Sequence, residues 1–168
     1  MAFDVVPIAG RHIDGFRATL DAVARERRYL YFLEAPALDD ARKFVRNSIA
    51  KRYPHLVALE DGKVIGWSDV LPVDLRPLRA HTGTLGIGVL AQWRGRGIGS
   101  ALLRETLNRA RDFGFTRVEL VYRAGNSRAG RLYERFGFVR EGVQRNAVRL
   151  DGTYEDVICM ALLMEERA

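Results

Sequence analysis

The stretch TGTLGIGVLAQWRGRGIGSALL, residues 82–103, decides the fold of this chain. Its apolar first half is followed by Gly95, Gly97 and Gly99, and then a helix-forming run begins. Glycines between a strand and a helix let backbone N–H groups approach a ligand, and the unpaired N–H groups of a helix N-terminus add a partial positive charge. The pattern therefore predicts an anion site, typically for phosphate.

Positive charge is concentrated in and after this stretch. Residues 94–149 carry 13 arginines and five acidic residues, a balance of +8, whereas the rest of the chain has a balance of −2. Arg94 and Arg96 flank the glycines, and guanidinium groups match phosphate oxygens. An anionic partner is therefore expected, although solvated helix faces are an alternative. Because the arginines fall on several elements and form no recognition helix, a phosphorylated ligand is favoured over nucleic acid.

The composition of the whole chain predicts one globular domain over residues 1–168, because 48% of the residues are hydrophobic. No apolar run approaches the ~20 residues that span a membrane, and the N-terminus lacks the pattern of a signal peptide. Cys159 is the single cysteine, and His12, His55 and His81 lack metal-ligand spacing, so we expect no disulfide and no metal. These features predict a cytoplasmic protein without a membrane partner, and exposed sheet edges would favour a homodimer.

Two hairpins and four helices are expected from the pattern of apolar residues. Asp61-Gly62 and Asp151-Gly152 each separate two apolar runs, which is a strong β-hairpin signal. Strands separated by helices in the middle of the chain, with hairpins on both sides, predict an α/β (α+β) fold with a mixed sheet. Predicted helices lie at 12–28, within 34–52, at 97–113 and within 126–138, and predicted strands at 3–8, 55–60, 63–73, 82–90, 117–122, 139–150 and 153–164.

Three phosphate-binding designs compete for the glycine stretch. The P-loop requires Lys-Ser or Lys-Thr after its last glycine, but Ser100 and Ala101 stand there. The dinucleotide fingerprint has its strand, its helix and an acidic residue at Glu119, but its third glycine would fall on Ser100. The hairpins also replace the βαβ units that this fold needs. Acyl-CoA binding is the third design.

RGRGIG resembles the R/Q-x-x-G-x-G/A signature of the GNAT superfamily of N-acetyltransferases, through Arg94, Gly97 and Gly99. NSRAGRLYERFGF is similar to the second motif of the superfamily, N-x-x-A-x-x-x-Y-x-x-x-G-F. The residues that match this second motif are Asn126, Ala129, Tyr133, Gly137 and Phe138. The two motifs occur in the family's order, and the chain looks most like bacterial enzymes that acetylate amino acids, polyamines or protein N-termini. The resemblance implies a twisted, mostly antiparallel sheet of about seven strands with about four helices on both faces.

The resemblance also implies an activity and a cofactor. The expected reaction transfers acetyl from acetyl-CoA to the primary amine of a small molecule or a protein N-terminus, by direct attack in a ternary complex. In the family, the strand that contains Gly86 and Gly88 bulges and splays from the next strand, and the pantetheine arm enters the gap. By resemblance, N–H groups near Val89 and Leu90 hold the arm or polarise the thioester carbonyl. The implied cofactor-binding residues are Val89, Leu90, Arg94, Gly95, Arg96, Gly97, Ile98, Gly99, Ser100, Asn126, Ala129 and Tyr133.

Tyr133 is the candidate acid for the leaving thiolate. A phenol has a reference pKa of about 10, so it is protonated at neutral pH and can donate to sulfur. Tyr133 follows Asn126 by two helical turns, which puts both residues on one helix face. Packing between helix and sheet is the alternative role for Tyr133, and capping the helix is the alternative role for Asn126.

The base that accepts the amine proton is less evident. Many relatives carry a glutamate near position 84, where this chain has Thr84, and this departure leaves a water chain or a carboxylate from elsewhere to accept the amine proton. Glu34 is our first candidate, as an amine-binding group or base, and Asp69 and Asp156 flank the expected cleft. The absence of an acid at Thr84 also leaves open a CoA-binding module without catalysis. Cys159 lies in an apolar strand, which indicates a core residue rather than a nucleophile.

Overall fold

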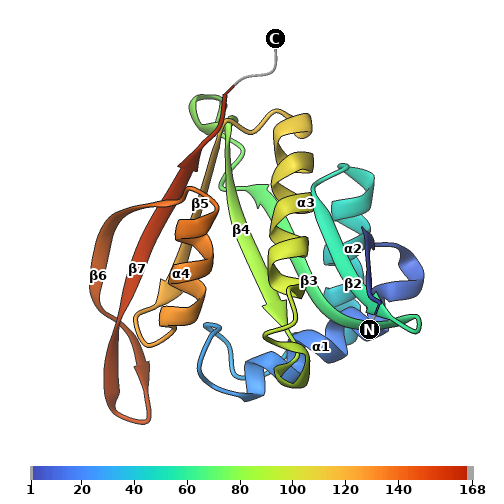
Figure 1. Ribbon diagram of the computed structural model, residues 1–168, viewed down its shortest axis with the longest axis horizontal. Helices are drawn as coiled ribbons and strands as arrows, with labels where there is room; N and C mark the ends of the chain where they lie inside the picture. The colour runs from blue at the N-terminus through green and yellow to red at the C-terminus, as the bar shows by residue number, and fades with distance from the viewer. Residues whose placement is uncertain (1, 166–168) are drawn as a thin grey trace.

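A computed structural model describes residues 2–165 and contains one seven-stranded sheet in the order β1-β2-β3-β4-β5-β7-β6 (Figure 1). Neighbouring strands are antiparallel except β4 and β5, which are parallel. This arrangement confirms the predicted fold class. The strands are β1 (Asp4–Pro7), β2 (His55–Glu60), β3 (Lys63–Pro72), β4 (Thr82–Val89), β5 (Arg117–Arg123), β6 (Val139–Leu150) and β7 (Thr153–Leu163).

Helices cover both faces of the sheet (Figure 1). On one face, Phe16, Leu20 and Val23 of α1 form an apolar cluster with Trp67 of β3. On the other face, Leu103 and its neighbours in α3 pack with residues of β5, α4 and β7. The described helices are α1 (Ile13–Arg25), α2 (Leu38–Ala50), α3 (Ile98–Phe113) and α4 (Ser127–Arg135), with short 3-10 turns at Gly10–His12, Pro77–Arg79 and Ala91–Trp93. No helix within residues 2–165 is long and apolar enough to cross a membrane.

Both predicted hairpins form at their Asp-Gly pairs. Asp61 and Gly62 have φ angles of 46° and 75°, and Asp151 and Gly152 have φ angles of 49° and 81°. Two successive residues with positive φ give the turn whose twist matches the twist of the flanking strands. The Asp-Gly pairs therefore fix the β2–β3 and β6–β7 connections.

The strand β4 pairs with its two neighbours over very different lengths. Its register with β3 is unbroken from Gly66 opposite Val89 to Pro72 opposite Gly83, so the predicted bulge in β4 is wrong. Its pairing with β5, in contrast, covers only Thr82–Thr84. Beyond Thr84 the two strands separate, and the predicted gap between them is present.

The glycines of β4 have a different role from the predicted bulge. A Cβ atom at Gly88 would collide with the Trp67 indole ring, and one at Gly86 would lie 3.2 Å from a carboxylate oxygen of Asp69. Gly86 and Gly88 therefore make room on β4 for two side chains that lean over from β3.

Candidate active site

A cleft of about 1260 Å³ continues the gap between β4 and β5. Its walls come from the end of β4, the glycine turn before α3, and the first two turns of α4. Such a volume exceeds that of the usual small-ligand pocket, ~300–1,000 Å³, and suits a long ligand. The sequence-predicted residues that line it are Val89, Arg94, Gly95, Gly97, Gly99, Ser100, Asn126, Ala129 and Tyr133.

The N-terminus of α3 turns its backbone toward this cleft. Gly97 caps the helix with a φ angle of 83°, a left-handed conformation that glycine adopts readily and that residues with a Cβ atom rarely adopt. The first bond within the helix runs from the Ala101 N–H to the Gly97 carbonyl oxygen, so the three preceding N–H groups have no acceptor inside the helix. The side chain of Ile98 is buried in the core, so only its backbone can serve a ligand. The first turn contains no acidic residue that would oppose an anion.

The Arg94 side chain is engaged by other residues of the protein and is therefore not available as an unpaired charge at the anion site. Its guanidinium group forms an ion pair with Glu26, and its Nε donates to the Val89 carbonyl oxygen at 2.9 Å. The same group lies 4.8 Å from the centre of the Tyr29 ring. The hydrogen bond to Glu26 raises the pKa of Arg94. Arg96, the second predicted arginine, lies over the Trp93 ring at 4.8 Å.

Arginines of α4 contribute charge that the motif comparison did not single out. Arg128 and Arg135 line the cleft together with Arg28, and within residues 2–165 none of the three forms an ion pair with a carboxylate. Arg128 reaches across to the glycine turn, where its Nη2 lies 3.2 Å from the position that a Cβ of Gly95 would take. The excess of arginine after residue 94 was the signal that could have located this group.

The backbone of β4 offers amide groups to the gap. The Leu90 N–H donates to the Ile65 carbonyl oxygen at 3.0 Å, so it is not free to hold a ligand as predicted. N–H groups alternate in direction along an antiparallel strand. The N–H groups of Val89 and Ile87 therefore point away from β3 and toward the gap. Alternation along the strand could have singled out Ile87, which the sequence prediction omitted.

Asn126 and Tyr133 lie on α4 as expected. Asn126 caps the helix, because its Oδ1 accepts a hydrogen bond from the Ala129 N–H at 3.3 Å. Tyr133 is 6% exposed and packs between the rings of Tyr122 and Phe138. Burial, and then the neighbouring Tyr122, raise the pKa of Tyr133 above its ordinary value. The phenol thus keeps its proton at neutral pH and can donate it into the cleft that it lines.

The segment 26–36 crosses the sheet face opposite α3 and α4. Tyr29 lines the cleft, and the carbonyl oxygen of Arg27 accepts a hydrogen bond from Arg123 of β5. Burial and the neighbouring Cys159 of β7 raise the pKa of Tyr31. Cys159 is half-buried there instead of lying deep in the core. The segment also exposes a run of large apolar side chains, namely Tyr31, Phe32 and Leu33.

The structure separates the carboxylates that the sequence offered as bases. Glu34 is 71% exposed and pairs with Arg25, and Asp156 accepts a hydrogen bond from the Asn146 N–H. Asp69 is 7% exposed, and burial raises its pKa to about 7. Thr84, at the position of the missing acid, is exposed on β4. Within residues 2–165, no cluster of side chains has the composition to hold a metal ion.

Together these features form one cleft whose α3 end suits an anion and whose lining includes the protonated phenol of Tyr133. The family model described as Acetyltransferase (GNAT) family matches residues 19–138, and the chain belongs to this family. Both signature motifs of the sequence lie within the matched residues.

Curated relatives agree with this assignment. The chain is 36% identical over 107 residues to the L-amino acid N-acetyltransferase AaaT of Escherichia coli, covering 63% of this chain and 65% of that protein. It is 35% identical over 111 residues to the N-alpha-acetyltransferase RimI of Mycobacterium tuberculosis, covering 62% of this chain and 64% of that protein. The matched stretches therefore span just under two thirds of either relative.

A solved structure shows the same fold. The GNAT superfamily phosphinothricin acetyltransferase of Sinorhizobium meliloti, solved in complex with AcCoA, matches with a TM-score of 0.91 over 99% of this chain and 91% of that one. The two sequences are 21% identical, so the likeness concerns the fold.

Proposed function

We propose that the protein is an acetyl-CoA-dependent N-acetyltransferase that acetylates the primary amine of a small molecule by direct attack in a ternary complex. The observation that carries the proposal is the continuity of one cleft. The cleft joins a phosphate-type site at α3, two inward-facing amides of β4, and the buried phenol of Tyr133. Acetyl-CoA supplies an acetyl group activated as a thioester.

The residues of the cleft fit the chemical parts of acetyl-CoA. The N–H groups of Ile98, Gly99 and Ser100 lack acceptors within α3 and suit the diphosphate. Arg128 and Arg135 supply positive charge beside them. The Val89 and Ile87 amides, which lack a partner on β5, suit the amide groups of the pantetheine arm.

Tyr133 is the proton donor of this proposal. Its raised pKa keeps the phenol protonated, and its place in the lining of the cleft gives it access to a leaving thiolate. Amides that point into the gap could also stabilise negative charge on the thioester oxygen. These groups come from two different elements, α4 and β4, on the two sides of the cleft.

An amino acid suits the acceptor side better than a polyamine. A polyamine carries several positive charges and would need carboxylates without counterions. On the sheet face opposite α3 and α4, however, Glu34 pairs with Arg25, and Glu155 pairs with Arg123. Asp69, which makes no ion pair among the described residues, is buried on that face and offers one carboxylate, enough for a single ammonium group. The apolar residues Tyr31–Leu33 favour an acceptor with an apolar side chain, and the similarity to the L-amino acid N-acetyltransferase AaaT supports the same class.

A CoA-binding module without catalysis is the second candidate, and it is favoured by Thr84. Nucleic-acid binding is a weaker alternative, because arginines without a carboxylate partner among the described residues, such as Arg128 and Arg135, line the cleft. The homodimer and the cytoplasmic location stay predictions.

Two measurements test the proposal. Calorimetry with acetyl-CoA should show saturable binding at one site per chain, and absence of binding would contradict both candidates. Thiol release from acetyl-CoA should then be followed across amino acids, polyamines and N-terminal peptides. Turnover with an apolar amino acid supports the proposal, turnover with peptides or polyamines alone contradicts the acceptor class, and binding without any turnover favours the inactive module.

A further inference from the structure

Two carboxylates flank the point where β4 and β5 separate. Asp69 stands opposite Gly86 in the register of β3 with β4, and Glu119 stands opposite Thr84 in the register of β4 with β5. Side chains directly opposite one another, or two residues apart on one strand, lie on the same face of a sheet. Both carboxylates are therefore on the face opposite α3, at the inner end of the gap.

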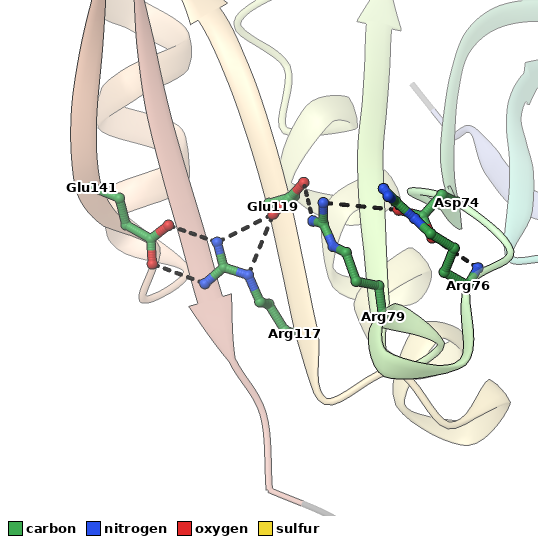
Figure 2. Close-up of polar contacts among 6 residues, drawn as sticks. All are labelled: Asp74, Arg76, Arg79, Arg117, Glu119 and Glu141. Carbon is green, nitrogen blue, oxygen red and sulfur yellow. Dashed lines mark hydrogen bonds and ion pairs between the residues drawn. The ribbon is translucent and has the colours of Figure 1, made fainter.

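Glu119 is held by two guanidinium groups (Figure 2). Its carboxylate accepts hydrogen bonds from Arg79 at 3.2 Å and from Arg117 at 3.2 and 3.3 Å. Arg117 in turn pairs with Glu141 of β6, and Arg79 lies 3.9 Å from Asp74. These contacts engage both carboxylate oxygens of Glu119, so neither oxygen is left to approach a ligand in the gap.

Asp69 has a different environment. Its carboxylate oxygens lie 3.2 and 3.3 Å from the position of a Cβ on Gly86, so the carboxylate occupies the space of a β4 side chain. Trp67 leans over Gly88 in the same way, and Gly88 lines the cleft. The Asp69 carboxylate thus leans from β3 toward β4, on the side of the gap, and it is buried behind the residues that line the cleft. Within residues 2–165 it makes no ion pair.

The groups around Asp69 carry no charge. His55 stands opposite Asp69 on β2, is buried, and has no hydrogen-bond partner for either ring nitrogen among the described residues. Burial lowers the pKa of His55 to about 4, so the ring is neutral at pH 7. From β4 the neighbour is Gly86, and the rings of Phe16 and Phe44 pack against His55 from α1 and α2.

We propose that Asp69 is the general base that takes a proton from the ammonium group of the acceptor. This inference rests on the proposed acetyltransferase function. The carboxylate accepts one proton, and the freed lone pair of nitrogen forms the C–N bond to the acetyl carbon. The C–S bond breaks, and its electron pair goes to sulfur, which takes a proton from Tyr133. The acylated nitrogen releases its second proton, and this proton restores the Tyr133 phenol. Asp69 returns its proton to water, so an ammonium ion and a thioester give an amide, a thiol and one proton.

The electrostatics of the site agree with this role. Burial alone raises the pKa of Asp69 to about 7, and a base is most effective when its pKa lies near the working pH. Glu34, the first candidate that the sequence offered, lies in the loop before α2, where it is exposed to solvent and paired with an arginine.

The test begins with a measurement that needs no turnover. The ¹³C chemical shift of the Asp69 carboxyl group in the free protein should titrate with a midpoint near pH 7. A midpoint in the ordinary range for aspartate would overturn the assignment, whether or not an acceptor has been found. Calorimetry with acetyl-CoA on the same sample separates this outcome from failure of the proposed function, which would appear as absence of binding.

The kinetic arm uses Asp69→Asn, which keeps the shape of the side chain. Loss of a general base should lower kcat about 100-fold or more, with the Kd for acetyl-CoA changed less than twofold. The acidic limb of the wild-type pH–rate profile should disappear, so that the residual rate rises as the amine deprotonates in solution. Asp39→Asn, the same change on the exposed surface of α2, is the matched control and should leave kcat and the profile unchanged.

A second variant protects the test against a folding defect. Gly86→Ala places a methyl group 3.2 Å from the Asp69 carboxylate and should shield it, lowering kcat at least tenfold with acetyl-CoA still bound. Retention of near-wild-type kcat and pH profile by a folded Asp69→Asn protein would overturn the proposal. Loss of activity in Glu34→Gln but not in Asp69→Asn would also overturn it, in favour of Glu34.

Discussion

Asp69 and Glu119 carry the same chemical group on the same face of one sheet, yet their surroundings are opposite. Glu119 is 30% exposed and lies between Arg79 and Arg117, whereas Asp69 is buried beside Gly86 without a counterion among residues 2–165. The difference shows that the neighbours of a carboxylate, more than its nearness to a cleft, decide whether its oxygens are left without an ion pair. At the inner end of the gap, Glu119 of β5 is therefore held in ion pairs, whereas Asp69 of β3 has a pKa near neutral pH.

The largest effect should appear in the pH dependence of stability. Burial raises the pKa of Asp69 from 3.8 to about 7, so the folded protein holds a proton that the unfolded chain releases. The contribution of Asp69 to wild-type stability should therefore fall as the pH rises from 4 to 7 and then level off. The buried His55, whose pKa is lowered to about 4, contributes in the opposite direction but is common to wild type and Asp69→Asn. The free energy of unfolding of Asp69→Asn, relative to wild type, should increase by roughly 4 kcal/mol across that range. Urea denaturation followed by circular dichroism at pH 4–8 measures this, and parallel curves for the two proteins would contradict it.

Tyr133, on the other face of the sheet, should show the second-largest effect. Burial raises the pKa of Tyr133 as it does that of Asp69, but the phenol stays fully protonated. Tyr133→Phe should lower kcat about 100-fold, or ~2.7 kcal/mol, because the leaving thiolate loses its proton donor. Steady-state kinetics with calorimetry checks this, since the Kd for acetyl-CoA should stay within twofold. An unchanged kcat, with chemistry as the slow step, would exclude Tyr133 as the acid.

Arginines with and without a carboxylate partner should also differ, and the third-largest effect concerns Arg128, which has no such partner among the described residues. Arg128→Ala should weaken acetyl-CoA binding about tenfold, or ~1.4 kcal/mol, because its guanidinium group faces the glycine turn without a carboxylate partner in the described part of the chain. The loss should shrink as salt is added. Calorimetry at two ionic strengths measures both.

Arg94→Ala is the paired counterpart. This variant removes the partner of the half-buried Glu26 and the bond to the Val89 carbonyl, so it should lower stability by about 1–2 kcal/mol. Thermal denaturation checks this. If Arg128→Ala and Arg94→Ala changed the Kd for acetyl-CoA and the melting temperature by the same amounts, pairing with a carboxylate would not distinguish the two arginines.

The smallest effect should come from the ion-pair network itself. Glu119→Gln removes one charge from partly exposed pairs, which typically contribute little, so stability should change by less than about 1 kcal/mol. The value of kcat should stay within twofold, since Glu119 has no part in proton transfer. A large loss of activity in this variant would reverse the roles that we assign to the two carboxylates.

Local sequence patterns predicted the frame of the molecule. The Asp-Gly pairs at residues 61–62 and 151–152 fix two hairpins through backbone conformation alone. Gly97 marks the start of α3 for the same reason. The cap at Asn126 and the place of Tyr133 follow from spacing within one short helix. These features depend on residues close together in the chain, so the sequence is sufficient to find them.

The features that the sequence did not predict depend on distant residues. Asp69 is buried because α1 and α2 cover β3, and its carboxylate reaches Gly86 because of the register of β3 with β4. Arg94 is engaged by Glu26, 68 residues earlier in the chain. The bulge expected in β4 is missing, because the glycines accommodate Trp67 and Asp69 instead. No local pattern contains this information.

The short contact between β4 and β5 has a consequence for cohesion of the sheet. Within residues 2–165, strand pairing joins β1–β4 to β5, β7 and β6 through Thr82–Thr84 of β4 alone, and the adjacent His81 carbonyl oxygen accepts hydrogen bonds from the N–H groups of Thr116 and Arg117. Any molecule whose own amides bond to both strands would complete the missing ladder and link the two halves. Occupancy of the gap would then raise the melting temperature and slow hydrogen exchange at Ile87 and Val89, so the substrate would act as a structural component of the protein that consumes it.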